Sequence, residues 1–351
     1  MKLLVTGVAG FIAARTAAML LDEGHEVVGV DNLNAYYDVR LKTYRLRELA
    51  AAAGADAALL DRFDLGRPGA AEYHGPAPFR AGRFTFARLD IEQQAAVDTL
   101  FREHRFDAVL NLAARAGVRY SMIDPEVYLA TNVLGTLHLM DAMRAQGCRK
   151  LVLASTSSLY AGQPMPFRED LPVNTPISPY AASKKAAEVL AYSYHYLYDL
   201  DVSVVRYFTV FGPAGRPDMS IFRFIKWMDE GTPIELFGDG SQARDFTYVD
   251  DIARGTIAAV APVGYEVINL GGGNNPISIN EVIAFLETAL GKRAVIARKP
   301  FHRADMQQTY ADISKAGRLL GWSPEVAPYD GFDRTVRWYQ ENVGWLRQVV
   351  V

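Results

Sequence analysis

The sequence has very few residues that could cross-link the chain or hold a metal ion. Cys148 is its only cysteine, so no internal disulfide can form, and the composition favours a reducing compartment. The six histidines are scattered without the spacing of metal ligands, and we expect no metal site. The opening residues "MKLLVTG" read as a strand and not as a signal peptide, so the expected location is the cytoplasm.

An excess of charge and a long apolar run are also missing. Residues 3–21 are mostly apolar, but Arg15 and two glycines interrupt them, so we expect no membrane span. The formal net charge is −3 and the pI is about 6.1, which disfavours nucleic acid or an anionic membrane as the main partner. With 351 residues, the chain is expected to form two lobes or one enlarged α/β domain.

Short apolar runs alternate with helical patterns through the first two thirds of the chain. Helical patterns lie between most of these runs, notably at 126–146 and 180–199. Continuous apolar strands that alternate with helices form parallel sheets covered on both faces, so we expect an α/β fold with a Rossmann-like, doubly wound parallel sheet. The predicted strands are 2–7, 26–30, 83–89, 108–114, 150–155, 202–207 and 265–271.

After about residue 208 the sequence becomes rich in Gly, Pro and polar residues, as in "FGPAGRPDMS" and "FGDGSQARD". We interpret these stretches as binding loops of a smaller C-terminal lobe, interleaved with the sheet because "YEVINLG" returns to a strand pattern. Residues 50–82 are rich in Ala, Gly and Pro, and we expect them to form a surface insertion. The expected division is a larger domain of residues 1–207 and 245–271, and a substrate lobe of residues 208–244 and 272–351.

A glycine loop follows the first predicted strand. In "TGVAGFIA", Gly7 and Gly10 stand between strand and helix, where backbone amides and the helix N-terminus can approach a pyrophosphate. Asp31 ends the second strand, and its carboxylate can bind both ribose hydroxyls of NAD but would repel the 2′-phosphate of NADP. NAD is therefore the expected cofactor, while Arg15 leaves NADP open as the alternative.

The stretch "SPYAASKKA" places a tyrosine in the first turn of a helix. Ser178 fits the N-cap and Pro179 the first helical position. Because successive helical residues turn by about 100°, Lys184 shares the face of Tyr180 and Lys185 does not. An adjacent ammonium, the positive helix end and a cationic nicotinamide would each lower the pKa of Tyr180 toward that of a general base. A packed tyrosine with a solvated lysine is the alternative interpretation.

Polar groups follow two other predicted strands. Thr156 comes after the fifth strand in "ASTSSLY", where its hydroxyl can bind the reacting oxygen, and Ser157 and Ser158 offer further hydroxyls. A capping run of small polar residues would explain some of these, but less easily all of them. Asp90 and Ile91 end the third strand and can line an adenine pocket, although an ordinary strand-end acid is the competing interpretation.

These motifs occur in an order that resembles a known family. From "TGVAG" through "NLAA", "STSSLY", "SPYAASK", "RYFTVFGP" and "ARDFTYVDD", the chain resembles the extended short-chain dehydrogenase/reductase family of nucleotide-sugar enzymes. The likeness is most specific to the branch that epimerises UDP-uronates at C4. It is carried by "DNLNAYYDVRLKTYRL" (31–46), "AARAGVRYS" (113–121), "RYFTVFGPAGRPDM" (206–219) and "TYADISKAGRLLGWSP" (309–324), and it covers nearly everything except 50–82.

The resemblance implies roles for individual residues. The catalytic set would be Thr156, Tyr180 and Lys184. NAD would be bound by Gly7, Gly10, Phe11, Ile12, Asp31, Asn32, Asp90, Ile91, Leu112, Ala113, Ala114, Asn132, Tyr180, Lys184 and Tyr207. A UDP-sugar would be bound by Arg119, Thr156, Ser157, Ser158, Tyr180, Thr209, Arg216, Arg244 and Asp305, with Arg244 and Asp305 at the uridine diphosphate. The family also implies a homodimer, paired through the helices predicted at 126–146 and 180–199.

The resemblance further implies oxidation at C4, rotation of a 4-keto sugar and re-reduction from the opposite face. The family's dehydratases carry Asp-Glu after the threonine, whereas this chain has Ser157 and Ser158, so dehydration is not expected. With Thr209, these hydroxyls suit a carboxylate, and we expect interconversion of UDP-glucuronate and UDP-galacturonate. A UDP-glucose 4-epimerase, a UDP-glucuronate decarboxylase and a catalytically silent NAD-binding scaffold are the alternatives. The chain departs from the family at Ala304, and we assign no role to His302 or Arg303.

Overall fold

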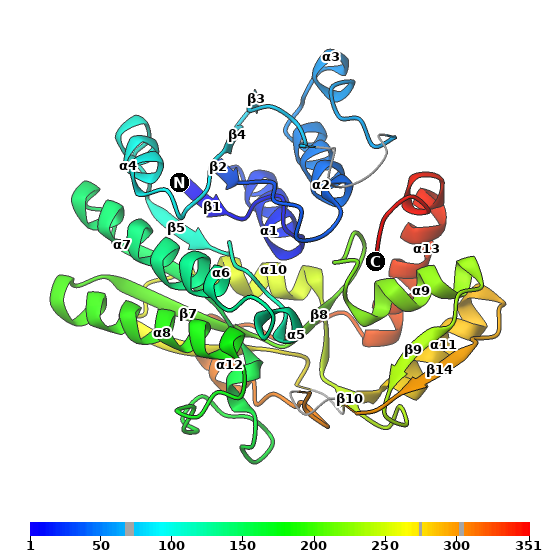
Figure 1. Cartoon of the computed structure of the whole chain (residues 1–351). Coiled ribbons are helices and arrows are strands. Elements are labelled where there is room, and N and C mark those ends of the chain that lie inside the picture. Colours follow the sequence, from blue (N-terminus) through cyan, green and yellow to red (C-terminus); the bar gives the residue numbers. More distant parts are fainter. Residues whose placement is uncertain (67–73, 274–275, 302–304) are drawn as a thin grey trace.

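The computed structural model describes residues 1–66, 74–273, 276–301 and 305–351. Its main sheet has eight strands in the order β12-β7-β6-β5-β1-β2-β4-β3, and every neighbouring pair is parallel except β3–β4 (Figure 1). The predicted doubly wound sheet is therefore confirmed. The strands are β1 (Lys2–Thr6), β2 (Glu26–Asp31), β3 (Phe79–Ala81), β4 (Phe84–Arg88), β5 (Ala108–Asn111), β6 (Lys150–Thr156), β7 (Asp201–Tyr207) and β12 (Tyr265–Leu270).

The inner strands are apolar because helices cover both of their faces. All seven residues of β6 are buried, as expected for a central parallel strand. One face of the sheet packs against α1 (Phe11–Asp22), α2 (Val39–Ala52), α10 (Val249–Ala258) and α12 (Ser314–Leu320). The other face packs against α4 (Gln94–Glu103), α7 (Gly135–Gln146) and α8 (Pro179–Tyr198) (Figure 1).

The order of the strands fixes where a ligand can bind. From β1 the chain continues to β2 on one side and later to β5 on the other, so the strand order reverses at β1. The carboxyl ends of β1, β5 and β6 share one edge, and such a reversal opens a crevice at that edge. The loops that follow these strands carry the predicted site residues.

A smaller lobe, to the right in Figure 1, has a hydrophobic core of its own. Among the described residues it contains three two-stranded pairs in place of a continuous sheet, and the chain leaves it to form α10 and β12 and again to form α12, which pack with the main sheet. Its helices are α9 (Ser220–Glu230), α11 (Ile279–Leu290) and α13 (Pro328–Leu346). Its strand pairs are β8 (Thr209–Phe211) with β11 (Phe246–Tyr248), β9 (Ile234–Phe237) with β14 (Ile296–Lys299), and β10 (Ala243–Arg244) with β13 (Ile277–Ser278).

The segment 50–82 is more than a surface insertion. It begins with the end of α2 and the short helix α3 (Ala57–Leu60), as its composition suggests. Phe79, however, is buried against Phe63, with ring centroids 5.4 Å apart, and β3 pairs with β4. The segment therefore adds an antiparallel strand that covers one edge of the main sheet. Residues 67–73 lie outside the described ranges.

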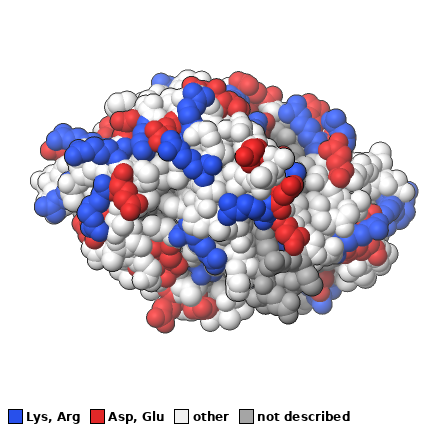
Figure 2. Space-filling view, turned by 90° about the horizontal axis from the view of Figure 1, so that it is seen from above, with Lys and Arg blue, Asp and Glu red and all other residues white. Residues whose placement is uncertain are grey.

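The surface has no single dominant sign of charge on the face shown in Figure 2, where basic and acidic side chains are interspersed. Among the described residues, none of the helices is both long and apolar enough to cross a membrane. The same part of the chain contains no group of three or more His, Cys, Asp or Glu side chains arranged to hold a metal ion.

Candidate active site

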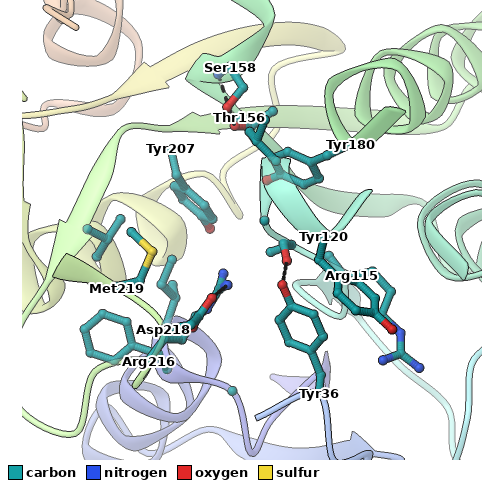
Figure 3. Close-up of a pocket in the computed structure, with 18 of the residues that line it drawn as sticks. Tyr36, Arg115, Tyr120, Thr156, Ser158, Tyr180, Tyr207, Arg216, Asp218 and Met219 are labelled. Atoms are coloured by element: carbon teal, nitrogen blue, oxygen red, sulfur yellow. Dashed lines mark hydrogen bonds and ion pairs between the residues drawn. The ribbon is translucent and has the colours of Figure 1, made fainter. Parts of the chain in front are cut away.

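A cavity of about 830 Å³ lies at the carboxyl edge of the sheet and extends to the smaller lobe (Figure 3). It gathers the glycine loop, the ends of several strands, the start of α8 and the loops of the second lobe. All the predicted site residues except Asn132 line it: Gly7, Gly10, Phe11, Ile12, Asp31, Asn32, Asp90, Ile91, Leu112, Ala113, Ala114, Arg119, Thr156, Ser157, Ser158, Tyr180, Lys184, Tyr207, Thr209, Arg216, Arg244 and Asp305.

The loop between β1 and α1 needs glycine at its first position. Gly7 has φ +66°, and a Cβ there would lie 2.8 Å from the Cα of Ala113 in the loop after β5. Gly10 is the N-cap of α1 and offers no side chain to cap it, and the first turn contains no acidic residue. The free amides and the positive end of this helix therefore face the cavity, where an anionic group can bind them.

Asp31 stands at the end of β2 with partners of its own. Its carboxylate accepts a hydrogen bond from the Leu33 amide at 2.7 Å, and the ammonium of Lys42 lies 3.2 Å away. Arg15, which kept NADP open as an alternative, is paired with Asp250 through two bonds of 2.7 and 3.1 Å. Because Arg15 is bound to Asp250, the basic residue next to Asp31 in the cavity wall is Lys42. No sequence pattern had predicted a role for Lys42.

Asn132 does not line the cavity, and its side chain is used elsewhere. The helix predicted over 126–146 consists of α6 (Glu126–Leu129), the π-helical turn η1 (Ala130–Leu134) and α7. Asn132 lies in this widened turn, where its amide group accepts from the Arg115 amide and donates to the Arg115 carbonyl. It therefore holds the loop after β5 in place. The motif spacing could not reveal this, because the π-helical turn sets where the side chain points.

Helix α8 begins as the sequence predicts. The Ser178 side chain accepts from the Ala181 amide, and Pro179 occupies the first turn, which places Tyr180 at the cavity wall. Burial raises the pKa of Tyr180, while a hydrogen bond with Thr156 and the charge of Arg216 act in the opposite direction. The protein's own groups therefore do not give the expected lowering of this pKa, because desolvation of the phenolate outweighs the Thr156 hydrogen bond and the Arg216 charge. The part of the expectation that depends on a bound cationic nicotinamide stays a prediction.

Lys184 lies one turn further along α8 and is only 4% exposed. Burial lowers its pKa to about 8, and the Glu188 carboxylate opposes this fall. The ammonium makes no hydrogen bond or ion pair with the part of the chain that the structure describes. Because Lys184 also lines the cavity, its ammonium is suited to donate to a polar ligand bound there.

The end of β6 supplies hydroxyl groups beside Tyr180 (Figure 3). The Thr156 hydroxyl accepts from the Ser158 amide and donates to the Ser158 hydroxyl, both at 3.1 Å. Tyr207 ends the neighbouring strand β7, and its ring borders the cavity, but its hydroxyl bonds Thr256 of α10 at 2.8 Å. Tyr207 can therefore offer a cofactor its ring and backbone, and its hydroxyl is already occupied.

Arg216 enters the middle of the cavity from the second lobe. It is paired with Asp218 at 2.5 and 3.0 Å, and this pairing raises the pKa of its guanidinium despite burial. Tyr36 lies beside it and donates a 2.5 Å hydrogen bond to the Ala116 carbonyl (Figure 3). Neither Tyr36 nor Asp218 was predicted as a site residue, although both lie in stretches that carry the family resemblance. Their place in "NAYYDV" and "GRPDM", close to predicted site residues, was the available signal.

At the opposite end of the cavity, Arg119 and Asp305 bind each other across the two lobes. Their ion pair measures 2.6 Å, and the Arg119 guanidinium also stacks 3.8 Å from the ring centroid of Phe237. Arg244 is close enough to feel the charge of Asp305, although burial lowers the pKa of its guanidinium. These cations form the positive end of the cavity. The family departure at residues 302–304 lies outside the described part of the chain.

A dinucleotide fits the first half of this cavity. The uncapped N-terminus of α1 can receive a pyrophosphate, Asp31 can accept from ribose hydroxyls, and Lys184 needs a polar partner. The second half, with Arg244 and Arg119, offers a separate cationic region for another phosphorylated ligand. The arrangement brings a buried tyrosine and a hydroxyl group to the boundary between the two regions.

Comparisons with known proteins agree with this geometry. A curated UDP-glucuronate 4-epimerase from Thermodesulfobacterium geofontis is 54% identical over 348 residues, covering 99% of both chains. A crystal structure of UDP-glucuronic acid 4-epimerase from Bacillus cereus, in complex with UDP-glucuronic acid and NAD, is similar with a TM-score of 0.84 and 35% identity, covering 97% of this chain and 100% of that one. The UDP-glucose 4-epimerase of Thermus thermophilus, in complex with NAD, gives a TM-score of 0.78 at 30% identity, over 97% of this chain and 99% of that one.

The sequence profile of the NAD-dependent epimerase/dehydratase family matches residues 3–271, which include nearly all of the main sheet and helix α8. The glycine loop, Asp31 and the pair Tyr180 and Lys184 all fall within the matched region. This chain therefore belongs to the NAD-dependent epimerase/dehydratase family.

Proposed function

We propose that this enzyme interconverts UDP-glucuronate and UDP-galacturonate by oxidation and re-reduction at C4 of the sugar. The observation that carries the proposal is a single cavity that joins a dinucleotide region to a cationic region, with Tyr180, Thr156 and a cluster of hydroxyls between them. The 54% identical relative is a UDP-glucuronate 4-epimerase, and the similar Bacillus cereus enzyme was solved in complex with UDP-glucuronic acid and NAD; both support this substrate.

The chain's own groups suit each role in this reaction. When bound, NAD accepts hydride from C4 and returns it. Tyr180 takes the proton of the 4-hydroxyl, and Thr156, which shares a hydrogen bond with Tyr180, holds the reacting oxygen. Arg244 and Asp305 anchor the uridine diphosphate at the far end, so that the 4-keto sugar can rotate without leaving the cavity.

The uronate carboxylate is assigned to the hydroxyl cluster. Ser157, Ser158 and Thr209 border the same cavity as Thr156, and hydroxyl donors suit a carboxylate. A 4-keto uronate is a β-keto acid that can lose carbon dioxide. Hydrogen bonds to the carboxylate would disfavour that loss if they hold the bond between the ring and the carboxylate in the plane of the C4 carbonyl. In that plane the breaking bond cannot overlap with the carbonyl π system.

Removing the hydroxyls of Ser157 and Ser158 should change the preference for UDP-glucuronate over UDP-glucose more than it changes turnover. In Ser157→Ala/Ser158→Ala, the ratio of kcat/KM for UDP-glucuronate to that for UDP-glucose should fall about tenfold or more, since each hydrogen bond to a charged group contributes about 1.5–3 kcal/mol. Competition between the two substrates in one reaction measures this ratio directly. Ser193→Ala, which removes a partly exposed hydroxyl of α8 that bonds the Val189 carbonyl, is the matched control. An unchanged ratio in the double variant would assign the carboxylate to other groups.

The function itself is tested by incubating the purified protein with UDP-glucuronate and following the products by NMR. Appearance of UDP-galacturonate, with no added NAD beyond that retained by the protein, is the expected result. A UDP-pentose with carbon dioxide would identify a decarboxylase. Conversion of UDP-glucose with no conversion of UDP-glucuronate would identify a neutral-sugar epimerase, and no product from either would contradict the proposal.

We also propose that the chain acts as a cytoplasmic homodimer. Its single cysteine is free and buried, which suits a reducing compartment. Helices α6 and α8, with the turn before α6, expose large apolar side chains, among them Ile123 (77%), Leu129, Tyr196 (76%) and Leu197. Two copies that pair through these helices would cover them. Sedimentation equilibrium should give twice the chain mass of 38.8 kDa, and Leu197→Glu/Tyr196→Glu should return it to one chain.

A further inference from the structure

Directly beneath the reactive residues lies a fully buried layer of polar side chains, which we call the polar layer: Ser155, Tyr160, Glu188, Arg206 and Asn269. None of its members is more than 4% exposed. Ser155, Arg206 and Asn269 are register partners on β6, β7 and β12, so their side chains form one row across the sheet. The next row along β6 and β7 contains Thr156 and Tyr207 of the cavity.

Glu188 of α8 is the centre of this layer. Its carboxylate accepts two bonds from Arg206, at 2.9 and 2.7 Å, and one from the Ser155 hydroxyl at 2.6 Å. Arg206 also donates to the Tyr160 hydroxyl, which in turn donates to Asn269, both at 2.8 Å. A buried bidentate pair of this kind is rigid, since breaking it leaves a charge without a partner.

The same helix face carries the catalytic groups. Tyr180, Lys184 and Glu188 recur every four residues on α8, so each is turned only about 40° from the one before. Glu188 therefore ties the face that holds Tyr180 and Lys184 to the strands that hold Thr156. Small shifts between such groups change reaction rates strongly, because catalysis depends on their alignment.

We propose that Glu188 is a positioning residue of this enzyme: it fixes the catalytic helix against β6 and β7 and places a negative charge one turn from Lys184. The role in turnover rests on the proposed epimerase function, whereas the effect on Lys184 does not. Burial alone disfavours the ammonium, and Glu188 supplies the negative charge one turn away that opposes it. Other charged or titratable groups also face this part of α8. Lys185 of the same helix lies 3.7 Å from the Glu188 carboxylate, and the Tyr265 hydroxyl of β12 donates to the Glu188 carbonyl. The rest are Arg206 from β7, Tyr160 from η2 (Ser157–Tyr160), Arg216 from the second lobe, and Tyr128 from α6, whose ring lies 6.1 Å from that of Tyr180.

The test compares Glu188→Gln with wild type in the full-length, NAD-containing protein. The amide keeps the shape of the carboxylate but leaves the Arg206 cation uncompensated beside Lys184. We expect kcat with UDP-glucuronate to fall about tenfold while KM changes less than threefold, since the groups that hold the substrate stay in place. The alkaline limb of the kcat–pH profile, which reports loss of the Lys184 ammonium, should move down by about one pH unit.

A second readout needs no turnover. The pKa of Lys184 in the NAD-free protein can be followed by NMR of isotope-labelled lysine, with Lys184→Met to assign the signal. Wild type should titrate near pH 8, and Glu188→Gln should titrate lower. An inactive wild type would contradict the epimerase function alone, whereas an unchanged Lys184 titration in Glu188→Gln would contradict the role of Glu188 alone.

A structural control separates positioning from general destabilisation. Asp201→Asn breaks a different ion pair, the one of 2.5 Å between Asp201 of β7 and Lys150 of β6, which lies at the opposite end of these strands from Arg206 and Ser155. It should lower the melting temperature and leave the pH profile unchanged. If Glu188→Gln does not fold, Glu188→Gln/Arg206→Met removes both charges and should still lower the alkaline limb, though by less. A wild-type kcat and pH profile in any folded Glu188 variant would overturn the proposal. So would a shift of the alkaline limb in Asp201→Asn as large as the shift in Glu188→Gln.

Discussion

Replacing Tyr180 by phenylalanine is expected to lower kcat about a thousandfold and to leave the fold and the bound cofactor intact. The ring fills the same volume, so the cavity wall and the start of α8 are preserved. The lost hydroxyl is the group that removes and returns the proton at the sugar 4-oxygen, and general acid–base catalysis contributes about 10²–10⁴ to a rate. Steady-state turnover of UDP-glucuronate, followed by NMR, measures the change.

The matched control is Tyr192→Phe, which makes the same chemical change on a more exposed part of α8. Its turnover should stay within about twofold of wild type, because surface substitutions away from a site have small effects. If Tyr180→Phe turned over at a comparable rate to this control, the proton would have to be carried by another group, and the assignment of Tyr180 would be wrong.

Lys184→Met should lower kcat/KM about a hundredfold or more, which is the second largest effect that we expect. The reason is that the substitution removes a buried group that binds and orients the reactants. The methionine replaces a buried side chain of similar length, so the packing of α8 is retained. The ammonium is lost as a donor to the bound dinucleotide, and with it a positive charge that favours ionised Tyr180. We therefore expect weaker retention of NAD through purification, measured as the molar ratio of NAD to protein, in addition to slower turnover.

Lys185→Met provides the comparison for this variant. Lys185 is the next residue, but it does not line the cavity. Its partly exposed ammonium lies 3.7 Å from the Glu188 carboxylate. Its replacement should leave NAD content unchanged and turnover within about threefold, as expected for a partly exposed ion pair. Equal losses in the two variants would show that α8 tolerates neither change for structural reasons.

Local sequence patterns predicted the features that depend on neighbours in the chain. The turn at Gly7, the N-cap at Ser178 and the shared face of Tyr180 and Lys184 follow from backbone preferences and helix periodicity, and the structure has all three. The seven predicted strands all belong to the main sheet, because central parallel strands are largely apolar, whereas the antiparallel edge strand β3 and the short strands of the smaller lobe were not predicted. The prediction that the site lies at the carboxyl edge of the sheet then followed from where such sheets bind ligands.

Features that depend on distant parts of the chain could not be predicted in this way. The pairing of Arg15 with Asp250 joins residues 235 positions apart, and the stacking of Arg119 on Phe237 joins two lobes. The expected lowering of the Tyr180 pKa was not found for the protein's own groups, for a related reason. Neighbouring charges are visible in a sequence, but the loss of water around a side chain is decided by the whole fold.

Strand β12 is translated well after β7, the strand with which it pairs, and this has a consequence for folding during synthesis. This edge strand is separated from β7 by much of the smaller lobe, yet it supplies Asn269 to the polar layer. When the ribosome has released the chain only as far as α10, the proposed catalytic groups are already outside it, but the strand that completes the layer beneath them is not. Until β12 docks, the edge of β7 is an open β-strand that can pair with other nascent chains. Maturation of the catalytic centre is thus tied to translation of β12, well after the groups that it supports.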